Sequence, residues 1–367
     1  NRFILIGILA LAIVTLSAVG AADGVNSTDD ADLTAIDESP QLNSEDDVEI
    51  LKEDNTIVVT NKTFSDYFDG SGHLSNSVAE GSTLDFQGLF EVSDTIKGVY
   101  IDKSVNITSS TKDATFMFNS TNGDLGKDYT EGRFIIDGVS KVSIENVAFN
   151  RTQVLIYDSS EVILDNIKMV SHNYNMFKDS SLTDALKTEE GILKICNDKR
   201  IFIKNSYFYA YKTISGIIEC RDIEDIVIDN NTFHSYSDRY GNANSVGRKV
   251  NLRTVANTAV MTNNVAYANC SLAGFAYLQA KEILFENNSC IYYKTTSSMY
   301  PMTVQLGQSD VKSKITVKNN SITELVIRGN AFVANNVVDR VETSGDSTIL
   351  INNTVNAVIV LESSNVL

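Results

Sequence analysis

The sequence contains few of the Pro, His and Cys residues that rigid turns, metal sites and many nucleophilic sites require. Its 367 residues include only 2 Pro, no Trp, 3 His and 4 Cys. His73, His172 and His234 lie far apart with no metal-binding or nucleophile motif around them, so they predict no metal centre and no cofactor. We expect His172 and His234 to decorate long turns. Abundant Asn, Ile, Val, Thr and Ser beside so little Pro indicate a protein built of strands with polar turns.

One pattern recurs nine times between Val142 and Val355: two apolar residues spaced two apart, then an Asn, then an apolar residue three places later. A spacing of two marks one face of a strand, whereas a helix needs spacings of three and four. Successive Asn residues are 16 to 39 positions apart, so one connection varies while the strands keep their length, as in a solenoid. The recurring residues are Asn146, Asn166, Asn205, Asn230, Asn264, Asn287, Asn319, Asn335 and Asn352.

Stacking these units predicts an all-β fold, a right-handed, single-stranded parallel β-helix with an irregular N-terminal cap. Asn suits its corners because it tolerates left-handed backbone angles and its amide can both donate and accept hydrogen bonds. We therefore expect the nine Asn residues to form a structural ladder. Leucine-rich repeats also stack Asn, but they space it differently and need a Leu consensus that is missing here.

The chain divides into four predicted segments. Residues 1–22 read as a signal peptide with a positive start and small residues before the cleavage site; a retained N-terminal anchor is the alternative. Residues 23–55 form an acidic leader, with twelve acidic residues against the single Lys52 between Asp23 and Asp54, which predicts disorder. Residues 56–131 hold the cap and the first irregular coils, with a short amphipathic turn at Phe64, Tyr67 and Phe68. Residues 132–367 form the β-helix.

Both ends of the sequence carry an expectation. The first residue is Asn rather than Met, so we expect the chain to lack at least its initiator. After Val355 nothing resembles a cap, and Leu367 ends the sequence partway through a coil. We expect the β-helix to be truncated there and this end to associate with another copy, because an uncovered last coil leaves backbone groups unpaired.

Charged residues gather at two turns. Arg221, Asp222, Glu224 and Asp225 form one cluster, and Asn197, Asp198, Lys199 and Arg200 lie one coil earlier. Ungapped alignment sets Lys199 beside Glu224 and Arg200 beside Asp225, so the structural interpretation, pairing across coils, is favoured over a catalytic one. No strand face shows carboxylates grouped with a basic residue, as polysaccharide cleavage would require.

Tyrosines after the Asn corners or in the long insertions are candidate contacts for sugar rings, although each can equally cover the next coil. The candidates for glycan contact are Tyr174, Tyr209, Tyr211, Tyr236, Tyr240 and Tyr293. Cys220 and Cys290 occupy columns of Ile and Phe and read as core residues, whereas Cys196 and Cys270 fall outside these columns. Disulfides stay possible, but no two Cys share a register in neighbouring coils.

Ten Asn-x-Ser/Thr sequons occur. Four of them begin at the ladder residues Asn230, Asn287, Asn319 and Asn352, which we expect to be buried and therefore not modified. The glycosylation candidates are Asn61, Asn119, Asn150 and Asn269.

Three strings at the start of the predicted fold resemble one known family: Phe64 to Leu74, Gly81 to Gly88 and Ile101 to Thr108. They are similar to the opening of the adhesin-like β-helix surface proteins of methanogenic archaea, and the repeats resemble that family's pectate-lyase-like solenoid. The resemblance implies an exported protein at the cell surface that presents its solenoid to other cells, host polymers or the cell wall. We expect the native protein to continue beyond Leu367 into more coils or an anchoring module.

These observations predict a non-catalytic, secreted or cell-surface protein that binds carbohydrate or other surface polymers along one flank. The alternative is a polysaccharide lyase or glycoside hydrolase. We expect a polysaccharide or glycoprotein partner, no nucleic acid, and membrane contact only through an uncleaved N-terminal segment.

Overall fold

The computed structural model describes residues 55–118, 132–171, 193–211, 217–236, 249–268, 274–292, 302–308, 312–345, 347–360 and 365–366. Within these residues the protein is almost entirely β-structure, with one short helix, and its strands belong to a single parallel sheet that winds around an axis. The predicted parallel β-helix is confirmed. The predicted signal peptide and all of the acidic leader except Asn55 lie outside the described residues.

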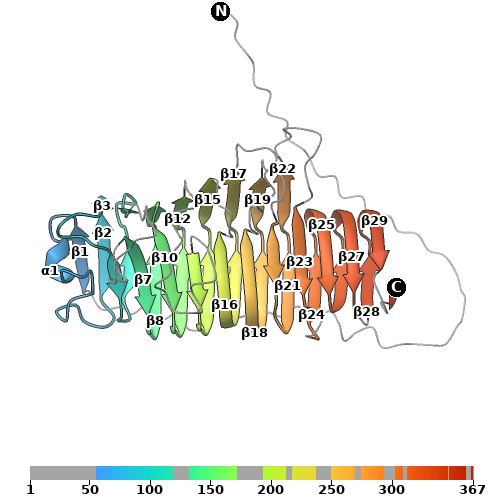
Figure 1. Cartoon of the computed structure of the whole chain (residues 1–367), viewed down its shortest axis with the longest axis horizontal. Coiled ribbons are helices and arrows are strands. Elements are labelled where there is room, and N and C mark those ends of the chain that lie inside the picture. The colour runs from blue at the N-terminus through green and yellow to red at the C-terminus, as the bar shows by residue number, and fades with distance from the viewer. Residues whose placement is uncertain are drawn as a thin grey trace, which may run out of the picture. The chain divides into compact units, whose positions relative to one another are not determined.

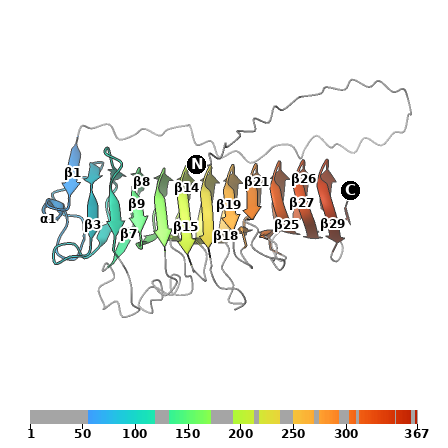
Figure 2. The same cartoon turned by 90° about the horizontal axis from the view of Figure 1, so that it is seen from above.

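Each coil, meaning one turn of the β-helix, contributes to three rows of strands (Figures 1 and 2). The first row holds β4 (Val99–Ile101), β7 (Arg133–Asp137), β10 (Gln153–Tyr157), β13 (Leu193–Cys196), the first halves of β16 (Ile218–Asp229) and β18 (Val250–Thr262), β20 (Ala276–Leu278), β23 (Thr303–Gly307), and the second halves of β25 (Ser321–Arg328), β27 (Val337–Ser344) and β29 (Thr354–Val360).

The second and third rows follow the first in every coil. The second holds β1 (Thr56–Thr60), β2 (Thr83–Gln87), β5 (Asn106–Thr108), β8 (Lys141–Glu145), β11 (Glu161–Asp165), β14 (Arg200–Lys204), the second halves of β16 and β18, β21 (Glu282–Glu286), β24 (Lys314–Lys318), β26 (Asn330–Ala334), β28 (Ser347–Ile351) and β30 (Asn365–Val366). The third holds β3 (Leu89–Glu91), β6 (Thr115–Met117), β9 (Ala148–Asn150), β12 (Lys168–Ser171), β15 (Tyr207–Tyr211), β17 (Thr232–Tyr236), β19 (Val265–Ala268), β22 (Ser289–Tyr292) and the first parts of β25, β27 and β29.

Parallel register stacks equivalent residues of successive coils. In the first row Phe134 pairs with Val154, Val154 with Leu193, and Leu193 with Ile218. All four are buried in one continuous apolar core that runs along the axis. Because strand side chains alternate between two faces, every second residue points into this core and the residues between point outward.

The helix α1 (Phe64–Tyr67) occupies the N-terminal end of the β-helix, as the amphipathic spacing predicts. Phe64 and Phe68 are buried there and stack with ring centroids 4.4 Å apart. Phe64 also contacts Phe90, and Phe68 contacts Phe86, each at 6.1 Å. The aromatic side chains therefore close the apolar end of the first coils.

The corner between the second and third rows has a left-handed backbone in nine successive coils, with φ between 49° and 59°. Eight of the nine predicted ladder residues lie there, but Asn263 replaces Asn264. The column comprises Asn146, Asn166, Asn205, Asn230, Asn263, Asn287, Asn319, Asn335 and Asn352. Side-chain bonds link some neighbours, such as Asn166 Nδ2 to Asn146 Oδ1 at 2.7 Å. The expectation that Asn230, Asn287, Asn319 and Asn352 are buried is wrong, because all four are exposed.

The buried ladder lies one position later, because the residue after a left-handed corner points inward. It comprises the buried residues Asn231, Asn264, Asn288, Asn320 and Asn336 and the partly buried Asn353, together called the amide column below. Asn264 is the one member that the sequence analysis placed in the ladder. In each step the backbone N–H and Nδ2 of one Asn donate to the Oδ1 of the next Asn; for Asn288 and Asn320 these distances are 2.8 and 3.2 Å.

A second left-handed column marks the corner between the first and second rows. Its members are Gly138, Asp158, Asn197, Asp222 and Thr254. Sequence analysis did not identify this column, because four different residue types occupy its five positions and only Asp occurs twice.

Candidate functional site

Four partly exposed aromatic rings lie together on the outward face of the third row. Tyr207 and Tyr209 come from β15, His234 from β17 and Tyr267 from β19. The register places Tyr209 beside His234, and His234 beside Tyr267. These four residues are called the aromatic strip. In Figure 1 the strands that carry these residues, β15, β17 and β19, are labelled at the upper edge of the β-helix.

The rings of the strip contact one another across coils. His234 stacks on Tyr267 with centroids 4.4 Å apart and an interplanar angle of 13°. Tyr207 lies 5.3 Å from His234 at 42°, and Tyr209 lies 6.4 Å from it at 36°. Strand spacing of about 4.8 Å brings equivalent side chains of neighbouring coils within stacking range. The strip therefore forms a line of neighbouring aromatic rings along the axis.

The strip carries no formal charge at neutral pH. Burial, and then the nearby positive charge of Lys249, lower the pKa of His234 below its usual value, so the imidazole is neutral at pH 7. The other three members are tyrosines. An uncharged row of aromatic rings with hydroxyl and imidazole groups suits a ligand that offers both C–H faces and hydroxyl groups.

The structure brings together some of the predicted glycan contacts. Tyr209 belongs to the strip, and the backbone register pairs Tyr211 with Tyr236 on the same two strands. Tyr174, Tyr240 and Tyr293 lie outside the described residues, as does His172. His234 was expected in a long turn, but it lies within β17. That expectation is wrong because the strand continues past the corner for five residues.

Sequence analysis did not place His234 or Tyr267 in the site, although a signal was present. Tyr209, His234 and Tyr267 each stand four positions after a left-handed corner residue, Asn205, Asn230 and Asn263 respectively. Aligning the corners aligns these rings in one outward column. The assignment of the fifth corner to Asn264 shifted Tyr267 out of that column.

The outward face of the first row gathers polar and charged side chains, including a carboxylate beside a lysine, a grouping that the sequence analysis did not identify. Lys194, Glu219 and Asn251 are adjacent in register on β13, β16 and β18. Asn251 Nδ2 donates to Glu219 Oε2 at 2.5 Å. All three side chains are buried, with exposures of 2%, 6% and 6%. Insertions of different length separate these residues in sequence, so a single strand shows no cluster.

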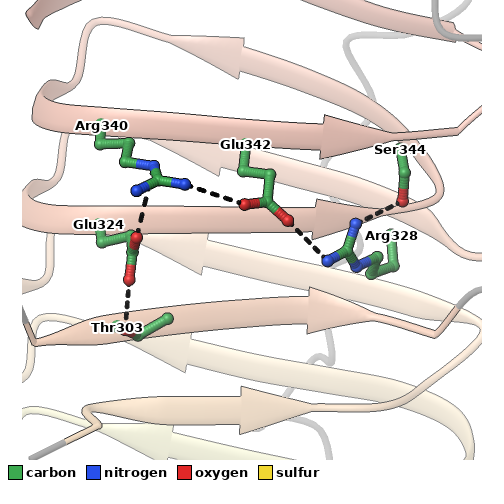
Figure 3. A network of polar contacts seen from close by, with 6 residues as sticks. All are labelled: Thr303, Glu324, Arg328, Arg340, Glu342 and Ser344. Atoms are coloured by element: carbon green, nitrogen blue, oxygen red, sulfur yellow. Dashed lines mark hydrogen bonds and ion pairs between the residues drawn. The ribbon is translucent and has the colours of Figure 1, made fainter. Parts of the chain in front are cut away.

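The same face carries an ion network in the last coils (Figure 3). Glu342 accepts from Arg328 at 2.7 Å and from Arg340 at 3.3 Å. Arg340 also reaches Glu324 at 3.6 Å. The remaining partners are Thr303 on Glu324 and Ser344 on Arg328. The residues of the network, drawn as sticks in Figure 3, come from β23, β25 and β27, which pair in register, so the network ties coils together.

The charged turn has the predicted register. Arg200 lies beside Asp225 in neighbouring coils. The ion pair of Arg200, however, is with Glu161 of the preceding coil, which also pairs with Lys141 at 3.1 Å. Asp198 is buried, and burial raises its pKa to about 7. Its Oδ1 accepts from the backbone N–H of Ser159 at 2.7 Å.

The described Cys residues are not bonded to each other. Cys196 and Cys220 are buried and Cys290 is partly buried, all three with free thiols, whereas Cys270 lies outside the described residues. Cys220 packs in the core and Cys290 is packed against it, as their columns predict. Within the part of the chain that the structure describes, no group of His, Cys, Asp or Glu could hold a metal ion. No helix among these residues is long and apolar enough to span a membrane.

Neither a protein-family model, nor a curated protein, nor a solved structure matches this chain.

Proposed function

We propose that this protein is an exported, cell-surface β-helix of adhesin-like type that binds uncharged carbohydrate polymers along its third row, without cleaving them. The observation that supports this most directly is the aromatic strip, a line of partly exposed rings repeated at coil spacing on one outward face. Export and surface location rest on the N-terminal apolar segment and on the resemblance of the opening strings.

The repeat of the strip fits a polymer rather than a single sugar. Tyr209, His234 and Tyr267 come from three successive coils, so equivalent groups recur along the axis. A ligand with repeating units can contact several of them at once, and several weak contacts then add to a useful affinity. The overall net charge of −17 disfavours polyanions, nucleic acids among them.

The binding test compares the strip with a matched aromatic residue elsewhere. The full chain is run in affinity gel electrophoresis through neutral and uronic-acid-containing polysaccharides. Tyr209→Ala should weaken binding to a neutral polymer about fivefold to tenfold, since one aromatic contact contributes about 1 kcal/mol. Phe332→Ala, which removes a partly buried ring from β26 in the second row, should leave the affinity unchanged.

Two results would contradict binding along the strip: equal affinities for Tyr209→Ala and the unchanged protein, or equal losses for Tyr209→Ala and Phe332→Ala.

Polysaccharide cleavage is a second candidate, favoured by the adjacent Lys194, Glu219 and Asn251 on the first row. A carboxylate beside a lysine could exchange protons with a sugar. Their burial makes binding along the exposed strip the better supported function. Assays for reducing and unsaturated ends on the same polysaccharides separate the two. Release of ends that Glu219→Gln abolishes would establish cleavage.

A further inference from the structure

Four sequons coincide with the left-handed corner between the second and third rows. Asn230, Asn287, Asn319 and Asn352 each begin an Asn-Asn-Ser/Thr triplet, with φ between 52° and 56°. The first Asn of the triplet is exposed at the corner, and the second Asn belongs to the amide column. The third residue, Ser or Thr, begins the outward face of a third-row strand.

N-glycosylation makes two demands on such a triplet. The Asn Nδ2 must reach the anomeric carbon of an oligosaccharide carried on a polyprenyl phosphate or pyrophosphate, and the Ser or Thr hydroxyl must be available to the transferase. The new C–N bond replaces the C–O bond to phosphate. The lipid phosphate leaves with the electron pair of that bond, and one amide proton passes to solvent.

Two sequons proposed from the sequence fail the second demand. At Asn150 the hydroxyl belongs to Thr152, which is buried and donates to the carbonyl of Phe116 at 3.0 Å. At Asn61 the hydroxyl of Thr63 bonds within the turn to Thr60 at 3.1 Å, and Asn61 Nδ2 donates to a backbone carbonyl. Asn119 and Asn269 lie outside the described residues.

The corner sequons differ in how their amides are used. Asn230 Nδ2 donates to Asn205 Oδ1 at 2.8 Å, and Asn319 Nδ2 donates to Glu286 Oε1 at 3.1 Å. Asn287 and Asn352 are exposed, and within the described residues their side-chain amides have no hydrogen-bond partner. The same holds, across the described ranges, for the hydroxyls of Ser289 and Thr354 two positions later.

We propose that Asn287 and Asn352 are N-glycosylation sites of the folded protein. Both project from one corner, separated by the coils of Asn319 and Asn335, of which the latter has no sequon. At a strand spacing of about 4.8 Å, this separation leaves room for two glycans on the same edge. Glycosylation in the cell requires that the protein is exported, as the proposed function states. The geometric argument and the test in vitro do not depend on export.

The test uses the full, folded chain with a purified oligosaccharyltransferase and its lipid-linked oligosaccharide. Site occupancy is read by mass spectrometry of glycopeptides. Synthetic peptides spanning Asn61, Asn150, Asn287 and Asn352 give the rate at each sequon without the fold. In the folded chain Asn287 and Asn352 should keep rates within about threefold of their peptides. Asn150 should fall by about tenfold or more, because Thr152 is reached only by local opening.

Ser289→Ala and Thr354→Ala provide the matched variants, since each removes one sequon and leaves the corner Asn and the amide column in place. Each should abolish modification at its own site and leave the other site unchanged. A folded chain that carries no glycan at Asn287 or at Asn352 refutes the proposal for that site. Modification of Asn150 at the same relative rate as the corner sites would refute the argument from geometry.

Discussion

Replacing Asn320 by Ala should destabilise the β-helix far more than changing the residue before it. Asn320 lies in the middle of the amide column and is 2% exposed. Its Nδ2 donates to the carbonyl of Phe285 at 2.9 Å and to Asn336 Oδ1 at 2.9 Å. Its Oδ1 accepts from the backbone N–H of Asn288 at 2.8 Å. Alanine removes all of these bonds and leaves the N–H of Asn288 buried without a partner.

The magnitude follows from that inventory. An unpaired buried backbone donor costs about 1 to 3 kcal/mol, and each lost bond between neutral groups costs about 1 kcal/mol. We expect about 3 kcal/mol in the free energy of unfolding of the coils around Asn320. Asn319→Gly is the control, because Asn319 is exposed with a φ of 56° and Gly adopts that angle without strain. It should cost a few tenths of a kcal/mol.

Two measurements check the difference. Urea denaturation followed by circular dichroism compares the midpoints of the two variants, and hydrogen exchange reports the Asn288 amide directly. Asn320→Ala should speed exchange at Asn288 and lower the midpoint, whereas Asn319→Gly should do neither. Equal midpoints, with the Asn288 amide still protected in Asn320→Ala, would show that the amide column does not stabilise the fold as argued.

Three other predictions follow from the structure. Gly307→Ala should destabilise the fold by about 2 kcal/mol or more, because φ is +80° and an added Cβ would lie 2.2 Å from the carbonyl oxygen of Arg328. The control Gly138→Ala, where φ is +66° and the space around the added Cβ is open, should cost about 1 kcal/mol. Thermal melts that rank the two variants in the opposite order would contradict this. The raised pKa of Asp198, about 7, means that the folded state binds the proton more tightly than the unfolded chain, so the stability that this group contributes is present at pH 4 and is lost as pH rises to 7. Asp198→Asn should therefore reduce the change in urea midpoint between pH 4 and pH 7. An equal change in the variant and the unchanged protein would contradict this assignment. Burial raises the pKa of the Cys196 thiol to about 11 and that of Cys220 well above its usual value, so neither should react with iodoacetamide at pH 7.5 until denaturant is added, as intact mass would show.

The fold could be predicted from the sequence, because every coil of a solenoid repeats the same spacing of apolar residues. The apolar pairs Val142/Ile144 and Val162/Leu164 pair in register as their spacing predicts. The helix α1 was also predictable, because Phe64 and Phe68 stand at helical spacing before a Gly. Both depend on local periodicity, which a single sequence displays.

The burial of the ladder was not predictable from the repeated Asn alone. Six coils carry two consecutive Asn residues at the corner, and periodicity cannot say which of the two is left-handed. The earlier coils indicate which of the two corner positions points inward. Val147, Ile167 and Ser206 stand in the second position and are buried. Two of these three are apolar, which marks the second position as the inward one.

The candidate site depended on register between distant residues. Lys194, Glu219 and Asn251 meet on one face although 25 and 32 residues separate them. Insertions of different length lie between them, and the register across such insertions cannot be predicted from a single sequence. The strip was partly predictable, because Tyr207 and Tyr209 alternate with inward residues on one strand.

The amide column also gives the solenoid a direction. Every bond between its members runs the same way, from the N–H groups of one Asn to the Oδ1 of the Asn in the following coil. In the amide column each coil therefore donates hydrogen bonds to the coil after it and accepts hydrogen bonds from the coil before it. Assembly on such a template proceeds as it does at a polar filament end, where the two faces of a subunit are not equivalent. During synthesis each emerging coil meets a preformed row of donors, so growth from the N-terminal end needs no later part of the chain to begin.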